Sequence, residues 1–555
     1  MKRLAGLLMA VMLLWATPLS AAAYEARLTR YADLPKGDWS EDAVYMLSVL
    51  EVLSGYEDGT FRPDEAVSRE AFIKMLMVAL EPLLGPIDVA TKKESANPSE
   101  VSEPQLTDVT QDRWSYPYIM EAFRYGWIDF LLEGDRFHPD KPMLREEVAA
   151  LVGRFLLLVD ERIYGGGQIG DQLGRLQTEE ELRRQFRDRA AIDSGLAPYV
   201  YLTTRYDIME GDDLGQFRPK DTLTRKEAAA IVYRLLQQQV AGVDVERIGF
   251  YALASYPNRA HLADLDQVIF GWSHLSYEGE GQASLQTAKG TYRIPDGYEE
   301  VLELAGKHGL PRQLMVFADG SDLQRFLRDE AARNRVVEDA IRLVLDEADR
   351  YGFTGICIDF EGLLSAEHRP YLVAFLKELR EALGNGAALS VAVPPADYYK
   401  GYDLETIGQL ADQVILMAHD YTHVESRLPS APLPLVGQAI RDALKAVPRD
   451  KLVLGISKQA NQWVESGGAV TYYSPTIPAV ESRRSQPGVE REWAMPYFLE
   501  RIHYVDGLET HTIWYESTES IERKVWLARY YGLSGVSFWH MGNLTEGDWQ
   551  LIGDI

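Results

Sequence analysis

The sequence lacks the residues that several kinds of cross-link and partner require. It has one cysteine, Cys357, among 555 residues, so no disulfide can form within the chain and folding must depend on hydrophobic cores. Its formal net charge of -27 argues against a nucleic-acid partner, because phosphate binding needs clustered Lys and Arg. Beyond the N-terminus no apolar run reaches about twenty residues, so we do not expect an integral membrane protein.

The first 23 residues have the features of a secretory signal. A basic start at residues 1–3 precedes an apolar run from Leu4 to Trp15, and the small residues Ala21 to Ala23 follow. About a dozen apolar residues is short for a membrane span but typical of a cleaved signal peptide. We therefore predict a signal peptide at residues 1–23, with an uncleaved N-terminal anchor as the alternative.

One sequence pattern occurs three times in the N-terminal half. Each copy has a Gly/Asp turn, an aromatic residue two positions before Pro, an Arg at a helix start and an amphipathic helix. The copies run from Gly55 to Leu80, from Glu133 to Leu158 and from Glu210 to Leu236. A further helix precedes each copy, and it opens at Trp39 in the first and at Trp114 in the second, whereas the third copy has no Trp there.

These repeats predict three modules. We place the first at residues 24–83, a polar linker at 84–105, the second at 106–160 and a loop with the third at 161–240. The pattern resembles the S-layer homology module, which implies an all-α pseudo-trimer that binds an anionic secondary cell-wall polysaccharide.

The resemblance implies which residues bind this polymer. They are Arg69, Arg145, Arg225, Trp39 and Trp114. A guanidinium at a helix N-terminus can pair bidentately with a pyruvyl or similar carboxylate. The alternative is that each Arg only caps or pairs within its own module.

The remainder of the chain, 245–555, alternates short β-rich runs with helical patterns such as 334–350 and 366–383. Eight strands with intervening helices predict an α/β fold of the (β/α)₈ TIM-barrel type, whose chemistry lies at the carboxyl ends of the strands. The stretch from Gln462 to Trp514 is expected to be irregular and to shape the cleft. The expected strands are Ile248–Leu253, Gln267–His274, Gln313–Phe317, Gly355–Phe360, Ala388–Val393, Gln413–Ala418, Lys451–Ile456 and Gly535–Trp539.

Two carboxylates end the fourth of these strands. Because alternate residues of a strand share a face, Cys357, Asp359 and Glu361 are expected to point into the barrel. Burial and mutual repulsion should raise the pKa of one carboxyl, which keeps a general acid protonated near neutral pH. A structural or ligand-holding pair is the alternative.

The barrel half resembles glycoside hydrolase family 18, and within it the branch of spore-cortex lytic and peptidoglycan-cleaving N-acetylglucosaminidases. The match rests on Asp359-x-Glu361 of the strand-four signature and on four later segments: Ser390–Pro395, Ala411–Asp420, Leu454–Ile456 and Gly535–Trp539. The family cleaves by substrate assistance and retains the anomeric configuration. The resemblance implies Glu361 as the general acid/base and Asp359 and Asp420 as partners of the substrate acetamido group.

The resemblance further implies Trp539 as the floor of the sugar subsite, although core packing is the alternative. Met417, His419 and Cys357 are the other candidate substrate-binding residues. The chain departs from the family pattern at Thr354 and Cys357, where aspartates are expected, and at His419, where Tyr is expected. Ser457–Gln459 also replaces the Pro and aromatic residues usual after strand seven.

No cofactor is expected, because no Gly-rich phosphate loop follows a strand. No metal site is expected either, since His419 and His423 flank Asp420 without an HExxH pattern. Cys357 is expected to be a buried apolar residue rather than a nucleophile.

The favoured hypothesis is a secreted glycosidase attached to the bacterial cell wall or S-layer. Its substrate would be a β-1,4-linked N-acetylglucosamine-containing glycan, with peptidoglycan ahead of chitin-like oligomers. The alternative is a weakened or inactive barrel that acts as a wall-glycan-binding surface protein. A purely structural S-layer lattice protein is a weaker third hypothesis, because a lattice does not require carboxylates at a barrel mouth.

Overall fold

A computed structural model of the chain describes residues 28–84, 106–164, 185–396, 398–422 and 427–555. The predicted signal peptide, and all of the predicted linker except Leu84, lie outside these ranges. The chain divides into two compact units, one of Arg30–Val243 and one of Asp244–Ile555, to which the described residues Leu28 and Thr29 also belong. Within the described ranges no helix is both long and apolar enough to cross a membrane.

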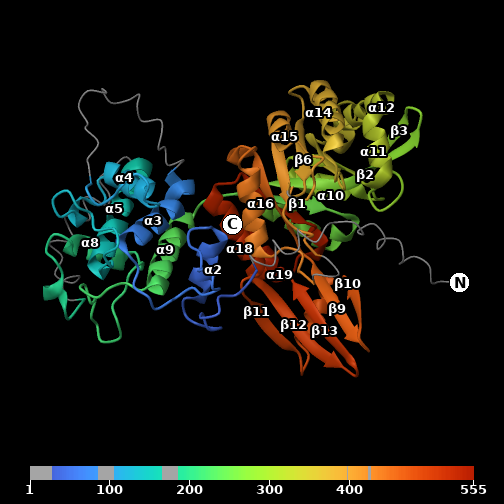
Figure 1. Cartoon of the computed structure of the whole chain (residues 1–555). Helices are drawn as coiled ribbons and strands as arrows, with labels where there is room; N and C mark the ends of the chain where they lie inside the picture. The colour runs from blue at the N-terminus through green and yellow to red at the C-terminus, as the bar shows by residue number, and fades with distance from the viewer. Residues whose placement is uncertain (1–27, 85–105, 165–184, 397, 423–426) are drawn as a thin grey trace, which may run out of the picture. The chain divides into compact units, whose positions relative to one another are not determined.

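The Arg30–Val243 unit is built from three helix pairs (Figure 1). In each pair a shorter helix precedes a longer one that begins with the repeated Arg, as the sequence predicts, although the longer helices extend past the predicted ends. The pairs are α2 (Glu41–Val49) with α3 (Arg69–Leu84), α4 (Tyr116–Arg124) with α5 (Arg145–Tyr164), and α8 (Ala197–Arg205) with α9 (Arg225–Val240). Short 3₁₀ turns lie at Asp129–Leu131 and Arg189–Ala191.

A ring of three backbone hydrogen bonds joins the modules. The amide of Val67 donates to the carbonyl of Leu223, that of Leu223 to Met143, and that of Met143 to Val67, each at 2.9 Å. These residues stand at equivalent positions, two residues before each long helix, and their side chains are buried. The ring therefore closes the three modules around a pseudo-threefold axis.

The starts of the long helices also join the modules in a ring, but they donate in the opposite cyclic order. The amides of Arg69 and Glu70 donate to the carbonyls of Lys141 and Pro139 in the second module. Arg145 and Glu146 donate in the same way to the third module, and Arg225 and Lys226 to the first. Helix N-termini carry amides without helical partners, and here the loop of the following module supplies the acceptors.

Eight parallel strands close into a barrel in the Asp244–Ile555 unit, which confirms the predicted fold class. Their order is β1-β14-β8-β7-β6-β5-β4-β2, and pairing of β1 with β2 closes the ring. The short strand β3 (Gln282–Gln286) pairs antiparallel with β2 outside the barrel. The barrel strands are β1 (Glu246–Tyr251), β2 (Gln267–Gly279), β4 (Arg312–Ala318), β5 (Gly355–Phe360), β6 (Ala388–Val393), β7 (Gln413–Met417), β8 (Leu452–Ser457) and β14 (Gly535–Trp539).

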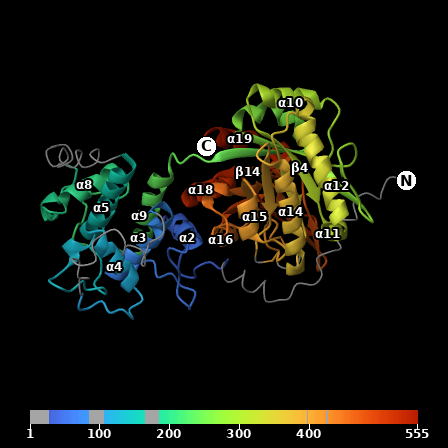
Figure 2. The ribbon, with the colours of Figure 1, turned by 90° about the horizontal axis from the view of Figure 1, so that it is seen from above.

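Helices surround the barrel (Figure 2). The sequence predicts one helix over 334–350, but the structure interrupts it with a π-helical turn at Arg342–Asp346, between α12 and α13. The helices are α10 (Tyr298–Lys307), α11 (Gly320–Arg328), α12 (Glu330–Ile341), α13 (Ala348–Tyr351), α14 (Arg369–Leu383), α15 (Leu404–Leu410), α16 (Leu433–Ala443), α18 (Thr518–Tyr531) and α19 (Glu546–Gly553). Residues Leu253–Asp264 form a long 3₁₀ segment, so the predicted first strand ends two residues early.

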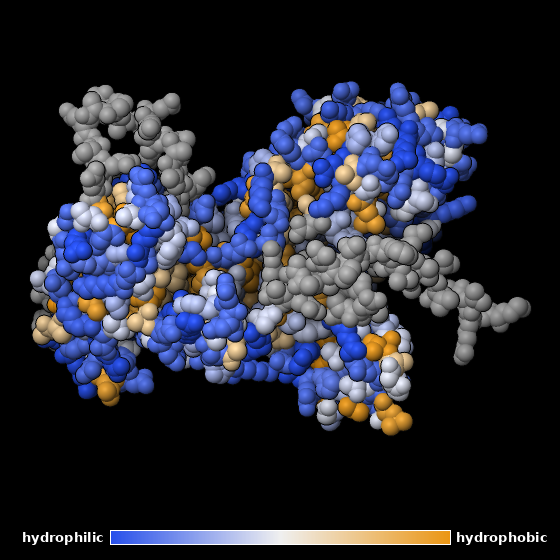
Figure 3. All heavy atoms as spheres, in the orientation of Figure 1, coloured by the Kyte–Doolittle hydropathy of each residue, from blue (hydrophilic) through white to orange (hydrophobic). Residues whose placement is uncertain are grey.

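The stretch from Gln462 to Trp514, expected to be irregular, is an ordered antiparallel sheet. Its order is β10-β9-β13-β12-β11, with α17 (Ile477–Arg484) inserted, and one face buries a cluster that includes Ile502, Ile513 and Tyr515. Apolar side chains also gather at its free end, where Leu508 is 94% exposed (Figure 3). The strands are β9 (Ala460–Ser466), β10 (Ala469–Tyr473), β11 (Glu490–Ala494), β12 (Leu499–Asp506) and β13 (Glu509–Tyr515).

We expect Arg69→Met to destabilise the three-module unit more than Arg225→Met. Arg69 is 2% exposed and pairs with Glu147 at 2.7 Å. Its removal would leave the buried Glu147 carboxylate without its partner and lower the free energy of unfolding by about 3–5 kcal/mol. Urea unfolding of the full chain, with hydrogen exchange to locate the change in α3, measures the difference. Adding Glu147→Leu to Arg69→Met should restore part of the loss; equal effects of the two Arg variants would contradict the expectation.

Candidate active site

The two predicted carboxylates lie at the carboxyl end of β5. Asp359 is 5% exposed, and its Oδ1 has no hydrogen-bond partner among the described residues. Glu361 directly follows the strand and is half-buried, and its amide donates to the carbonyl of Ala318 at 2.8 Å. This bond continues the β5–β4 ladder past the strand end, so Glu361 follows the same alternation as Asp359.

Burial keeps protons on this pair. Burial raises the pKa of Asp359 to about 7. Burial, followed by the negative charges of Asp359 and Asp420, raises the pKa of Glu361 to about 8, although His419 opposes the shift. Because two close carboxyls titrate as a unit, the pair holds at least one proton near neutral pH.

A third carboxylate, Asp420, is fixed in the loop after β7. His419 Nδ1 lies 2.7 Å from its Oδ2, and Gln459 Nε2 donates to its Oδ1 at 2.9 Å. The Ser430 hydroxyl contacts Oδ1 at 3.3 Å and accepts from the Asp420 amide at 2.9 Å. Asp420 adopts a φ of 62°, a left-handed conformation that a non-glycine residue holds only when its surroundings impose it.

These contacts keep Asp420 ionised, in contrast to the pair on β5. The side chain of Asp420 is 66% exposed, and although desolvation by its neighbours raises its pKa, the charge and hydrogen bond of His419 and the bonds from Gln459 and Ser430 outweigh this and lower the pKa to about 2. Burial lowers the pKa of His419, and Asp420 and Glu361 more than offset this, so the net shift is upward. The site thus combines carboxyls that keep a proton with one that does not.

Aromatic rings line the barrel beside the carboxyls. Trp539, the last residue of β14, packs edge-on against Phe250 at a centroid distance of 5.4 Å and lies 6.5 Å from Tyr292. Tyr292 in turn packs on Phe317 at 4.7 Å. Trp539 is only partly buried, so it contacts the core without being enclosed by it. Met417 at the end of β7 is also partly buried against the same core.

Cys357 lies fully buried in the barrel core, packed with residues such as Ile248, Met315 and Ile415. Burial and then the charge of Asp359 raise the pKa of its thiol. Its side chain is fully enclosed, so any influence on the groups at the strand end passes through Asp359. Thr354, the other departure, bonds with the backbone of Arg312 at the start of β4, far from the strand's carboxyl end.

Three neighbours of the carboxyls were not predicted as site residues. Tyr292 lies close enough to Asp359 and Glu361 that their charges, after burial, raise the pKa of its phenol. Burial and then the charges of Glu361 and Asp420 raise the pKa of Tyr399 to about 12. Gln459, in the segment that departs from the family pattern, holds Asp420. Its position just after a barrel strand was the available signal, whereas the two tyrosines lie in loops whose paths the sequence does not specify.

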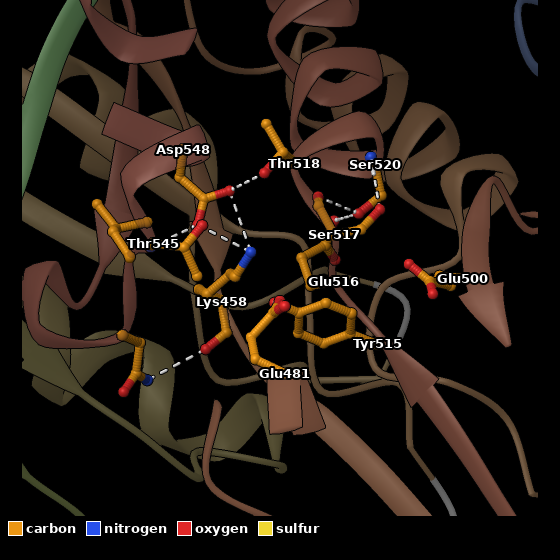
Figure 4. Close-up of polar contacts among 12 residues, drawn as sticks. Lys458, Glu481, Glu500, Tyr515, Glu516, Ser517, Thr518, Ser520, Thr545 and Asp548 are labelled. Carbon is orange, nitrogen blue, oxygen red and sulfur yellow. Dashed lines mark hydrogen bonds and ion pairs between the residues drawn. The ribbon is translucent and has the colours of Figure 1, made fainter. Parts of the chain in front are cut away.

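Two buried ion pairs fix the base of the five-stranded sheet to the barrel, and Figure 4 shows the first of them, between Lys458 and Asp548. Lys458 donates to Asp548 at 3.0 Å with both side chains at most 1% exposed, and Thr518 donates to the same carboxylate at 2.6 Å. Glu516 accepts from Lys524 and Ser520 at 2.6 and 2.5 Å. Because the Glu516 amide also donates to the carbonyl of Gln459, these pairs brace the loop that carries Gln459.

A cavity of about 450 Å³ lies beside these pairs, and none of the sequence-predicted residues lines it. Arg484 and Arg491, which do line it, both pair with Glu500, at 2.8 and 2.6 Å. Glu481, Glu519 and Glu546 also line it, so carboxylates outnumber guanidinium groups in its wall. In the described part of the chain, no group of three or more His, Cys, Asp or Glu residues is arranged to hold a metal ion; His423 lies outside it.

The predicted polymer-binding arginines all contact the following module rather than their own. Arg69 donates to the carbonyls of Leu131 and Phe137, Arg145 to those of Phe217 and Glu210, and Arg225 to those of Phe61 and Ser54. The expected alternative, pairing within one module, is therefore wrong in its choice of partner. Trp39 and Trp114, at the starts of α2 and α4, are 59% and 55% exposed.

Comparison with known proteins matches both halves of the chain. Residues 246–543, just over half of the chain, match glycosyl hydrolases family 18. Residues 30–73, 105–149 and 185–229 match the S-layer homology domain.

Curated relatives cover the barrel half. The chain is 28% identical over 249 residues to the "Putative sporulation-specific glycosylase YdhD" of Bacillus subtilis, and 26% identical over 245 residues to the cortical fragment-lytic enzyme of the same organism. Each match covers 41% of this chain, and the chain spans about half the length of these relatives, 56% and 54%.

Among solved structures, the spore cortex-lytic enzyme SleL of Bacillus cereus is similar at 19% identity and a TM-score of 0.46, over 56% of this chain and 74% of that one. A chitinase from Chromobacterium violaceum is similar at 19% identity and a TM-score of 0.49, over 56% and 98%. On the match of its barrel, the chain belongs to glycosyl hydrolases family 18 and carries three S-layer homology domains ahead of that barrel.

Proposed function

We propose that the protein is a cell-wall-attached glycosidase that cleaves β-1,4-linked glycans containing N-acetylglucosamine, with peptidoglycan as the first candidate substrate. One observation carries this proposal. A proton-holding carboxyl pair at the end of β5 lies within electrostatic reach of Asp420, a carboxylate fixed in its ionised form. Opposite protonation states in neighbouring carboxyls are what general acid catalysis at a glycosidic bond requires.

The proposed reaction is the substrate-assisted one that the family resemblance implies. Glu361 donates its proton to the glycosidic oxygen as the bond to the anomeric carbon breaks. The carbonyl oxygen of the substrate's own 2-acetamido group attacks that carbon from the opposite face and forms an oxazolinium ion. Water then attacks the anomeric carbon, Glu361 accepts its proton, and the configuration is retained.

The other residues hold the acetamido group. Asp359, next inward on β5, accepts from its N–H and offsets the positive charge that develops on the oxazolinium. Asp420, fixed by His419 and Gln459, holds the same group from the loop after β7. Trp539 supplies the apolar face for the sugar ring. His419 stands where the family has a tyrosine and contributes a ring N–H in place of the phenol.

The three modules would bind an anionic wall polysaccharide and hold the barrel next to its substrate. Exposed Trp39 and Trp114 support this part of the proposal, whereas Arg69 is 2% exposed and paired with Glu147. Attachment raises the local substrate concentration without any new contact at the active site. Secretion, which wall attachment requires, remains a prediction from residues 1–23.

A second candidate function, glycan binding without cleavage, is favoured by the surroundings of Asp359. Its neighbour inward on β5 is Cys357 rather than a carboxyl, and Asp359 Oδ1 has no partner among the described residues. Asp359 therefore has no second carboxyl beneath it with which to exchange a proton, which would slow turnover.

Mass spectrometry of the products from purified peptidoglycan and chitooligosaccharides tests the proposal. We expect new N-acetylglucosamine reducing ends, and a loss of about 10²–10⁴ in kcat for Glu361→Gln, which keeps the shape but not the transferable proton. Glu367→Gln, an exposed carboxyl nearby in sequence, is the matched control and should leave kcat unchanged. No products from the unaltered protein, with glycan binding retained, would establish the second candidate instead.

The pH profile of kcat/KM should have a raised alkaline limb. Glu361 must be protonated to act, and its pKa of about 8 places the fall of activity in that region rather than near the usual value for Glu. Asp359→Asn removes a charge that raises this pKa, so the residual activity should fall at lower pH. An alkaline limb that does not move in this variant would contradict the assignment of Glu361 as the acid.

Gln459→Ala should lower kcat by about tenfold or more, because it removes a hydrogen bond to a charged group, worth about 1.5–3 kcal/mol. The same substitution at Gln462, which instead contacts Tyr504 and His511 within the sheet, is the control and should change kcat little. Steady-state kinetics on a chitooligosaccharide compares the two; equal effects would assign the loss to the sheet as a whole.

A further inference from the structure

The three grooves between the modules have equivalent backbone contacts but differ in the charges of their side chains. Each groove lies where the start of one long helix meets the loop of the following module, and we number the grooves one, two and three after Arg69, Arg145 and Arg225. In all three the guanidinium donates to two carbonyls of that loop. Because these acceptors are neutral, whether the positive charge is balanced depends on other side chains.

A carboxylate at the third position of the following long helix balances two of the three arginines. Glu147 lies 2.7 Å from Arg69, and Glu227 lies 3.7 Å from Arg145. The equivalent residue facing groove three is Ala71, which has no charge. Among the residues that the structure describes, Arg225 forms no ion pair; its guanidinium lies over the rings of Tyr56 and Phe61, at 5.0 and 4.8 Å.

The second residue of each long helix also differs in charge between groove three and the other two. Glu70 and Glu146 occupy this position in grooves one and two and are matched by Arg113 at 2.7 Å and by Lys220. Groove three has Lys226 there, paired with Asp64 at 2.7 Å. Asp64 has a 78% exposed side chain, so water screens this pair and it contributes little to holding Lys226.

Groove three also has exposed aromatic side chains beside it. Trp39, 59% exposed, precedes α2, which packs against α9, the helix that begins with Arg225. Tyr56, 39% exposed, has the guanidinium of Arg62 at 3.8 Å in addition to that of Arg225. Groove one has Trp114, but its Arg69 is buried and its charge is matched, and groove two has Gly195 at the Trp position, one residue before the N-cap of α8.

We propose that groove three, between the third and first modules, is the site where the protein binds the anionic groups of a wall polysaccharide, and that grooves one and two mainly hold the modules together. The proposal rests on the wall attachment proposed above and says which of three similar grooves carries it. A carboxylate of the polymer would take the place at Arg225 that Glu147 and Glu227 take in the other grooves, while exposed Trp39 offers a face for a sugar ring.

Binding of the full chain to bacterial sacculi tests the assignment. The probes are Gram-positive sacculi that carry a pyruvylated polysaccharide and the same sacculi stripped of it by hydrofluoric acid. We expect Ala71→Glu and Lys226→Glu each to weaken binding to the intact sacculi by about tenfold or more, because each gives groove three the carboxylate found in the other two. Lys141→Glu, which makes the same change of charge as Lys226→Glu but at groove one, should change binding less than twofold.

Two controls separate charge from shape and folding. Ala71→Gln has nearly the volume of Ala71→Glu without its charge, and it should bind as the unaltered protein does. All variants should keep their melting temperature and their activity on soluble glycan, since the substitutions lie in the other unit.

Equal weakening by Lys141→Glu, or by Ala71→Gln, would overturn the assignment of groove three while leaving wall attachment in place. Unaltered binding by Ala71→Glu and Lys226→Glu would do the same. If the unaltered protein binds intact and stripped sacculi alike, attachment through this polysaccharide is itself wrong, and the groove assignment falls with it.

Discussion

The protonation of the site depends on the free-energy cost of ionising buried carboxyls at the carboxyl end of a parallel barrel. Alternation along β5 puts Cys357 in the packed core, Asp359 above it and Glu361 at the rim. Among the described residues no basic side chain bonds to Asp359, so ionisation of the pair is unfavourable and the proton stays. In the proposed reaction, this retained proton is the one that Glu361 gives to the leaving oxygen.

The opposite arrangement around Asp420 shows how the chain accommodates its departures from the family pattern. His419 and Gln459 stand where the pattern has other residues, and each bonds a different oxygen of the same carboxylate. Gln459 reaches Asp420 because the loop after β8 is braced by the buried pairs of Lys458 and Glu516. The five-stranded sheet is thus connected to the site through polar contacts as well as through the chain itself.

The sequence predicted the barrel, its strands and the carboxyls on β5 because each depends on a local signal: alternation, strand spacing and a short motif. It also predicted three modules from their repeats. It did not predict the ordered sheet after β8, whose strands pair residues as far apart as Ala460 and Tyr515, nor the proximity of Tyr292 and Tyr399 to the carboxyls. For Arg69 the sequence indicated a charged helix start, but only the packing shows that its charge is already matched by Glu147 of another module.

The ring formed by Val67, Met143 and Leu223 makes the order of assembly matter. Its closing bond joins the first repeat to the third, across more than 150 positions of chain, and contacts of such long range form late in folding because the entropy of closing the loop must be offset first. During synthesis the first two repeats emerge before the third, so until then Val67 and Met143 lack their hydrogen bonds to Leu223. A truncated chain that ends after the second repeat would remain without these bonds, so the three copies constitute one cooperative folding unit rather than three interchangeable parts.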